Sequence, residues 1–324
     1  VKDGEALAND GKGWEPIGVQ GSEFSGKFDG GEHEFNNIFI DRQDQIAVGL
    51  FGEVSMAEIK NLKILNANIK GGFQTGILAG DIYVSTISNI ISSGIIIGDR
   101  RVGGLIGEIS GSTIAKNLVS DVNVTGESSV GGLVGDNSSP LQNCSSIGNV
   151  TGAFDVGGLT GRSLDDITNC FSSGNVSGTG ENLGGLTGSN LYNTVKNSYA
   201  TGDVSGNPIN GSIGGFIGSN GIEQYGLSDP GGTVENCYST GKVSQEFSEN
   251  GLVGFNNGIV TDSYWDTETS GQNNSAGGIG KTTAQMTGDR APNNMMELDF
   301  INTWEITADD TGNGFTLFYP ILKA

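Results

Sequence analysis

The sequence has little of the chemistry that many enzymes and nucleic-acid-binding proteins need. It holds one histidine, His33, in 324 residues, so a metal site built from several histidines is excluded. Three cysteines cannot all pair within the chain, so no disulfide framework supports the fold. Lysine and arginine number 16 against 37 aspartate and glutamate residues, a net charge of −21. That charge excludes nucleic acid and anionic lipid as partners.

Long apolar segments are also absent. No apolar run approaches the ~18 residues that a membrane-spanning helix needs, so we expect no direct membrane insertion. The chain opens Val-Lys-Asp-Gly-Glu without a signal-peptide pattern, and a secreted form would be a mature or excised piece. Glycine, by contrast, supplies 56 of the 324 residues, more than twice the usual share of ~7%. Collagen is excluded by the irregular glycine spacing and by only 6 prolines, which leaves a repeat array.

A pattern close to Gly-x-Leu-x-Gly recurs eight times along the chain, with Phe216 in place of one leucine and Asn250 in place of the first glycine of the last repeat. A large apolar residue stands two positions before each closing glycine, and we expect this column to face a core. The residue directly before the closing glycine varies from Phe51 to Thr160, so strand alternation predicts that it is less constrained. The core column consists of Leu50, Leu78, Leu105, Leu133, Leu159, Leu186, Phe216 and Leu252.

A second column consists of asparagines, one in the stretch that follows each closing glycine. We expect their carboxamides to form a buried ladder inside a turn, each bonded to the coils on either side. Cys144, Cys170 and Cys237 follow three of these asparagines directly, and we interpret them as small buried apolar residues. The ladder residues are Asn61, Asn89, Asn117, Asn143, Asn169, Asn197 and Asn236, with Asp262 in the last repeat.

These repeats predict an all-β fold. The apolar segments are short, β-branched and bounded by Gly, Asn and Ser, without a helical period. One repeat of ~27 residues cannot bury its own apolar face, whereas stacked repeats form a continuous core. We therefore predict a right-handed parallel β-helix, or β-solenoid, of about eight coils with about three strands each. Residues 1–45 would form an N-terminal cap and first coil edge, 46–263 the solenoid, and 264–324 a C-terminal cap with a short helix N-capped by Asn294.

The repeat resembles the GLUG motif. The resemblance rests on Gly-Gly-Leu-Val-Gly at 131–135 and Leu-Gln-Asn-Cys at 141–144. The opening Trp-x-Pro-Ile-Gly at 14–18 and the later Ser-Tyr-Trp-Asp at 263–266 also resemble the first and last coils of such proteins. The motif occurs in bacterial and archaeal surface adhesins and in the non-catalytic part of IgA-specific metallopeptidases. It implies an extracellular, surface-associated β-helix that is often one segment of a longer protein.

Catalytic and metal-binding motifs are incomplete. His33-Glu34 begins a zinc-peptidase motif, but Asn37 replaces the second histidine. Gly280-Lys281-Thr282 lacks the upstream glycine of a phosphate loop, because Ser275 stands there. Two acidic runs begin like calcium loops but lack the twelfth-position glutamate; ordinary turns explain both, and a structural calcium stays open. Their candidate ligands are Asp266, Glu268, Asp309 and Asn313.

We therefore expect a non-catalytic, adhesin-like module without a cofactor, one monomeric segment of a larger extracellular protein that contacts a glycan or protein at a cell surface. An insert at 221–232 carries Tyr225 and Asp229, which we select as candidate binding residues. One alternative is a structural spacer of a larger surface protein or peptidase. Another is a β-helix polysaccharide lyase or hydrolase, which needs convergent carboxylates; the coil carboxylates are expected to fall in different columns.

Overall fold

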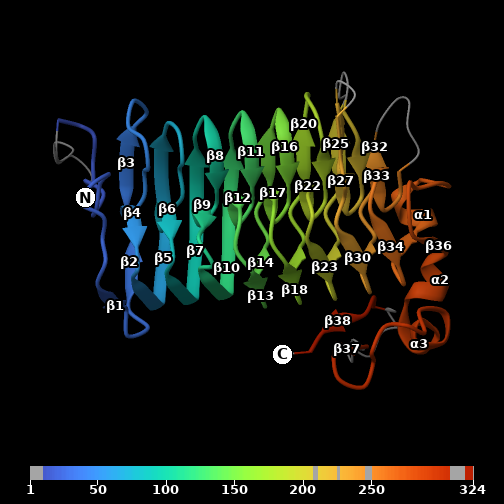
Figure 1. The fold of residues 1–324 in the computed structure, drawn as a ribbon. Coiled ribbons are helices and arrows are strands. Elements are labelled where there is room, and N and C mark those ends of the chain that lie inside the picture. Colours follow the sequence, from blue (N-terminus) through green and yellow to red (C-terminus); the bar gives the residue numbers. More distant parts are fainter. Residues whose placement is uncertain (1–9, 207–210, 225–226, 245–249, 307–317, 324) are drawn as a thin grey trace.

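The computed structural model describes residues 10–206, 211–224, 227–244, 250–306 and 318–323. It is a β-solenoid whose coils lie side by side along one axis (Figure 1). Neighbouring coils pair in parallel, with Val124 opposite Val150 and Val150 opposite Val176. The predicted parallel β-solenoid of about eight coils is confirmed, while its right-handed winding stays a prediction. In the described chain no helix is long and apolar enough to cross a membrane.

One sheet takes a single strand from each of eight coils. Each of these strands begins at the residue directly before a closing glycine of the repeat. They are β4 (Phe51–Ser55), β6 (Ala79–Tyr83), β9 (Ile106–Ser110), β12 (Val134–Asn137), β17 (Thr160–Ser163), β22 (Thr187–Asn190), β27 (Ile217–Asn220) and β33 (Val253–Asn256).

A second, narrower sheet contains the strand that precedes the Gly-Gly step of each middle coil. Its strands are β8 (Arg100–Gly103), β11 (Ser128–Gly131), β16 (Phe154–Gly157), β21 (Leu183–Gly184) and β26 (Ile213–Gly214). Strands β11 and β16 pair in parallel, with Val130 opposite Val156. The two sheets meet at the Gly-Gly-Leu corner of each coil.

The largest sheet wraps the remaining sides of the coils. Its first coil consists of β1 (Lys27–Asp29), β2 (Glu34–Asn36) and β3 (Phe39–Arg42), followed by the long strands β5 (Glu58–Gly71), β7 (Thr86–Ile97) and β10 (Ile114–Thr125). From residue 141 onward each long strand is replaced by short ones. These are β13 (Leu141–Gln142), β14 (Ser145–Ser146), β15 (Val150–Gly152), β18 (Ile167–Thr168), β19 (Phe171–Ser172), β20 (Val176–Gly178), β23 (Thr194–Lys196), β24 (Tyr199–Ala200), β25 (Val204–Gly206), β30 (Thr233–Glu235), β31 (Tyr238–Ser239), β32 (Val243–Ser244), β34 (Ile259–Thr261), β35 (Tyr264–Asp266) and β36 (Ile279–Lys281).

The asparagine column bends the chain within this sheet. Asn61, Asn89 and Asn117 have φ angles of 55°, 57° and 55°, in the left-handed region that asparagine tolerates better than most residues. The same conformation recurs at Asn143 and at every later member through Asp262. A middle coil therefore contains more, and shorter, strands than the three that we expected.

The core column is buried as predicted. Leu50 is 1% exposed and the other seven members are 0% exposed. The adjacent column is equally buried, since Phe51 and Thr160 are also 0% exposed, so the prediction of a less constrained position was wrong. The reason is the corner: the leucine lies in the turn and its neighbour begins the next strand, so strand alternation does not apply between them.

Glycines at this corner allow adjacent coils to approach closely. A Cβ atom on Gly132 would lie 2.1 Å from the carbonyl oxygen of Gly158, and one on Gly135 would lie 2.6 Å from the carbonyl carbon of Arg101. No side chain fits at such distances without moving the backbone. The repeated glycines therefore serve coil-to-coil packing.

Both ends of the rod carry irregular segments, and the large sheet runs across both boundaries that we expected. Near the first coil, Trp14 Nε1 donates to the carbonyl oxygen of Leu50 at 3.0 Å, while β1–β3 already pair with β5. At the other end β35 and β36 continue the sheet past residue 263. The insert forms an antiparallel hairpin of β28 (Ile222–Gln224) and β29 (Leu227–Asp229).

The C-terminal region contains short elements. They are α1 (Thr267–Ser270), α2 (Thr283–Met286), a 3₁₀ helix (Gly288–Arg290), α3 (Ala291–Asn294), β37 (Trp304–Glu305) and β38 (Ile321–Leu322). The expected helix N-capped by Asn294 was wrong, because Asn294 ends α3. Pro292 lies in the first turn of α3, where a missing N–H is tolerated, so the helix begins earlier than we predicted.

Candidate functional site

A third column, which the sequence analysis missed, lies two residues after each asparagine. Its members pair in register from coil to coil. The first four are not aromatic and the last four are. The column consists of Lys63, Ile91, Val119, Ser145, Phe171, Tyr199, Tyr238 and Tyr264.

The aromatic members form a stack. The ring centroids of Phe171 and Tyr199 lie 5.0 Å apart with an interplanar angle of 3°, and those of Tyr199 and Tyr238 lie 5.1 Å apart at the same angle. The stack ends at Phe171, because the next coil offers Ser145 at this position. One face of the Phe171 ring therefore has no neighbouring ring in the column.

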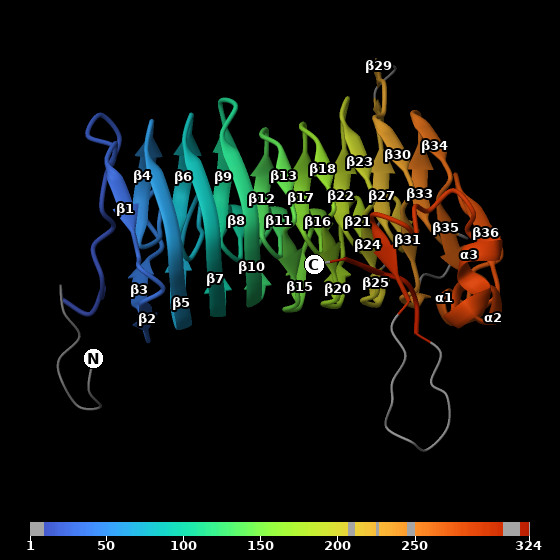
Figure 2. The ribbon, with the colours of Figure 1, turned by 90° about the horizontal axis from the view of Figure 1, so that it is seen from below.

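The C-terminal region covers this aromatic column. It folds back along the side of the rod, so that residues 318–323 lie beside the middle coils (Figures 1 and 2). Met286, Met295 and Trp304 are buried against Tyr199 and Tyr238 in a second apolar core. This burial raises the pKa of Tyr199 to about 12.

Two tyrosine hydroxyls fix the same region to the solenoid. Tyr238 donates to the carbonyl oxygen of Pro320. Tyr319 donates to Oδ2 of Asp266 at 2.6 Å. The predicted C-terminal cap therefore covers a side of the rod as well as its end.

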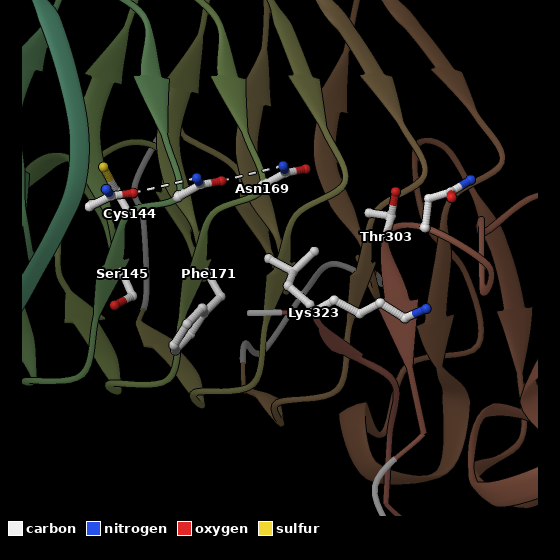
Figure 3. Close-up of a pocket in the computed structure, with 10 residues that line it drawn as sticks. Cys144, Ser145, Asn169, Phe171, Thr303 and Lys323 are labelled. Carbon is white, nitrogen blue, oxygen red and sulfur yellow. Dashed lines mark hydrogen bonds between the residues drawn. The ribbon is translucent and has the colours of Figure 1, made fainter.

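A pocket of about 500 Å³ lies where this cover stops. One wall consists of the asparagine column with Ser145 and Phe171 beside it, and the other comes from the region of β37 and β38 (Figure 3). None of its lining residues is acidic, although the chain has a net charge of −21. The lining residues are Asn117, Asn143, Cys144, Ser145, Asn169, Phe171, Asn302, Thr303, Leu322 and Lys323.

The predicted asparagine ladder forms one wall of the pocket. Asn117 Nδ2 donates to Oδ1 of Asn89 at 2.9 Å, whereas the corresponding bonds from Asn143 to Asn117 and from Asn169 to Asn143 are both 3.4 Å (Figure 3). The ladder ends there, because Oδ1 of Asn169 is buried without a hydrogen-bond partner. Asn197 shares the backbone conformation, but no hydrogen bond joins it to Asn169.

The ladder is not the buried feature that we expected. Asn89, Asn117 and Asn143 are exposed, and Asn61, Asn169, Asn197 and Asn236 are half-buried. A left-handed bend turns the side chain outward at the surface of the rod, so water competes for its hydrogen bonds. The carboxamides of Asn117 and Asn143 are therefore accessible next to the pocket, whereas Oδ1 of Asn169 is buried.

The interior beside the asparagines holds the three cysteines. Cys144 and Cys170 are free and at most 1% exposed, and Sγ of Cys170 accepts from the backbone N–H of Cys144 at 3.3 Å. Burial raises the pKa of the Cys237 thiol to about 12. The three cysteines are buried in the core, as interpreted from the sequence.

A row of four acidic residues, which the sequence analysis also missed, directly follows the closing glycines of the first four repeats. Glu53, Asp81, Glu108 and Asp136 pair in register across four coils, so the expectation that the carboxylates fall in different columns was wrong. The sequence signal was available, since each residue directly follows a closing glycine. Two carboxylates have close cation partners.

Arginines neutralise one end of this row. Nη2 of Arg162 lies 2.7 Å from Oδ2 of Asp136, and Arg101 contacts both Asp136 and Glu108. Oδ1 of Asp81 is buried without a partner. Burial, with the charges of Glu108 and Glu53, raises the pKa of Asp81 to about 6.

The other residues that we selected from the sequence lie apart from the pocket. Tyr225 falls outside the described residues, and Asp229 ends β29, which projects from the edge of the rod away from the C-terminus (Figure 2). Asp309 and Asn313 also fall outside the described residues. His33 is exposed in the turn between β1 and β2.

The first calcium candidates have other roles. Oδ1 of Asp266 accepts from the backbone N–H groups of Glu268 and Thr269, which caps α1. Oε2 of Glu268 accepts from the backbone N–H of Thr283 at 2.8 Å. Among the residues that the structure describes, no three His, Cys, Asp or Glu side chains are arranged to hold a metal ion.

Comparison with known proteins gives three kinds of similarity. The family described as the GLUG motif matches residues 152–177, 179–205 and 209–244. Halomucin of Haloquadratum walsbyi is 40% identical over 107 residues, which cover 32% of this chain and 1% of halomucin. A protein named as a Gly-rich membrane protein of Evansella cellulosilytica is 33% identical over 144 residues, 44% of this chain and 13% of that protein.

Among solved structures, an IgA1 protease superposes with a TM-score of 0.43 and 16% identity, covering 75% of this chain and 18% of that one. The chain thus spans a small part of each of these three proteins. The matched motif coincides with coils whose core leucines are buried and whose asparagines share one backbone conformation. Residues 152–244 of this chain therefore carry GLUG repeats.

Proposed function

We propose that the chain is a rigid, non-catalytic module of a larger extracellular or cell-surface protein, and that it contacts a glycan or a protein through the side of the rod. The observation that carries this proposal is the lateral pocket beside Phe171, where accessible carboxamides surround an aromatic ring. Clefts that combine an apolar surface with a few placed polar groups are the usual form of a ligand site. The names of halomucin and of the membrane protein support the proposed surface location.

Rigidity is part of the proposal. Each described coil pairs with its neighbours by backbone hydrogen bonds, and a second ladder runs beside the first. In it Oδ1 of Asn123 accepts from the backbone N–H of Asn149 at 3.1 Å, and Asn149 and Asn175 repeat the contact at 3.0 Å. A continuous core with such ladders makes sliding of one coil costly, so the pocket keeps its shape.

The proposal that the module is not an enzyme has support from the composition of the pocket. Its ten lining residues include no carboxylate and no histidine, and hydrolysis of glycosides commonly uses two carboxyl groups. A β-helix lyase remains the contrasting hypothesis. An assay for unsaturated or reducing products with added calcium separates the two, because sustained turnover would contradict a binding role.

The experiment that tests binding uses the labelled protein on arrays of glycans and of extracellular proteins. We expect saturable retention on one glycan or protein class that persists at raised salt, since the pocket is not highly charged. Retention by nothing on either array would favour the alternative of a structural spacer.

A further inference from the structure

The stack of aromatic rings leaves one position empty. Tyr238, Tyr199 and Phe171 are spaced at 5.1 Å and 5.0 Å with nearly parallel planes. The next in-register residue is Ser145, whose side chain ends at a hydroxyl. Continuing the same spacing, a ring bound on the free face of Phe171 would lie over Ser145, inside the pocket that both residues line (Figure 3).

The polar groups around this position are suited to hydroxyl groups. Oδ1 of Asn169 is a buried acceptor without a partner. The ladder bonds of Asn143 and Asn169 are 3.4 Å long, against 2.9 Å between Asn117 and Asn89. Of the three ladder carboxamides that line the pocket, Asn143 and Asn169 therefore donate the longer bonds, and each offers both donors and an acceptor.

The opposite wall comes from the C-terminal cover. Leu322 adds an apolar surface, and Asn302 and Thr303 add polar groups. Nζ of Lys323 donates to the carbonyl oxygens of Phe300 and Ile301, which holds this side chain against the C-terminal cover. The site is thus apolar at the ring, has no acidic group, and is rich in hydrogen-bonding groups at its rim.

We propose that this empty position is a saccharide subsite that takes one neutral hexopyranose ring, an inference that rests on the proposed function. A pyranose presents a face of C–H groups that can stack on Phe171 and a belt of hydroxyls that can pair with Asn143 and Asn169. An aromatic side chain of a protein partner would use the ring but would leave the carboxamides without new partners. The observed combination of ring and amides therefore favours sugar.

Binding of simple sugars tests the subsite directly. The probes are the methyl β-pyranosides of glucose, galactose, mannose and N-acetylglucosamine at millimolar concentration, followed by saturation-transfer NMR and titration. Ser145→Tyr fills the empty position with the residue that the column already carries at Tyr199, Tyr238 and Tyr264. We expect at least one pyranoside to bind the unaltered protein, with affinity reduced at least about tenfold in Ser145→Tyr and an undiminished unfolding midpoint.

Two more variants separate the subsite from general effects. Phe171→Ala removes the platform and should weaken binding to a similar degree. Phe154→Ala removes an exposed ring (42% exposed) on β16 and should leave binding unchanged. Equal binding by the unaltered protein and Ser145→Tyr would overturn the inference.

The subsite and the broader proposal can fail separately. Binding of none of the four pyranosides, or binding of N-acetyltyrosine amide in their place, also overturns the subsite. If the arrays retain the protein and Ser145→Tyr is retained equally, the surface-binding role stands while the subsite falls. If a pyranoside binds and Ser145→Tyr abolishes it, the subsite stands whichever glycan the arrays identify.

Discussion

The carboxamide of Asn117 donates to that of Asn89 at 2.9 Å although both side chains are exposed. Because water competes for this hydrogen bond, it contributes little to stability and is only a secondary reason for asparagine at this position. The primary reason is the backbone, since both residues have φ near +56° in a bend that every coil repeats. The two contributions can be separated by mutation.

Asn117→Ala should lower the free energy of unfolding by about 1–2 kcal/mol, because alanine is strained in the left-handed region. Asn117→Gly should lower it by less than about 1 kcal/mol, since glycine accepts that conformation and loses only the two exposed hydrogen bonds to Asn89 and Asn143. Urea denaturation measures both. If both variants lowered the free energy of unfolding equally, the carboxamide rather than the left-handed bend would be the reason for asparagine at this position.

Cys170→Ser should be nearly neutral, within about 1 kcal/mol. The reason is that Ser198 and Ser263 fill the same column and accept the same backbone N–H bond, each at 3.1 Å. Cys170→Ala should cost about 1–3 kcal/mol, because it leaves the buried N–H of Cys144 without a partner. Thermal unfolding of the two variants in parallel provides the comparison, and a more stable alanine variant would contradict it.

Asp81 should make stability depend on pH. Its pKa is raised from 3.8 to about 6 in the folded protein, so the folded state disfavours the carboxylate. The stability present below pH 4 is lost as the pH rises through 6. Asp81→Asn should therefore stabilise the protein at pH 7.5 by about 1–2 kcal/mol, after allowance for solvent screening, and much less at pH 4.

Denaturant titrations at the two pH values measure this difference. Asp121→Asn is the matched control, because it removes the same charge from an exposed position on β10. The same pH dependence in both variants would mean that the overall charge of −21, rather than the acidic row, is responsible.

Leu159→Ala should lower the free energy of unfolding by about 2–5 kcal/mol, because the side chain is 0% exposed and leaves a cavity between coils. Ile147→Ala is the control, since Ile147 is 46% exposed. Calorimetry of the pair tests whether the repeated leucine is the core column. Similar melting of both variants would contradict that assignment.

The sequence was sufficient for the solenoid because its strongest signals repeat. Leu133 and Leu159 occupy equivalent positions of neighbouring repeats, and equivalent positions stack from coil to coil. The burial of Thr160 could not be predicted from strand alternation, because the corner between Leu159 and Thr160 interrupts it. The location of the C-terminal region could not be predicted from the sequence either, because its contacts with Tyr199 and Tyr238 join residues far apart in the sequence.

Only part of the pocket could be predicted from the sequence. The aromatic residues two positions after the asparagines form a visible column in the sequence, and Ser145 marks its end. What the sequence could not provide is the opposite wall, because Leu322 and Thr303 follow no repeat. The insert around Tyr225 was predicted as the binding site instead, because it interrupts the repeat.

A crystal structure with the tightest-binding pyranoside tests the central claim most directly. The account predicts density for one sugar ring on the free face of Phe171, over Ser145, with hydroxyls within hydrogen-bond distance of Asn143 and Asn169. Full occupancy of the sugar at another surface, with the pocket holding only water, would contradict it.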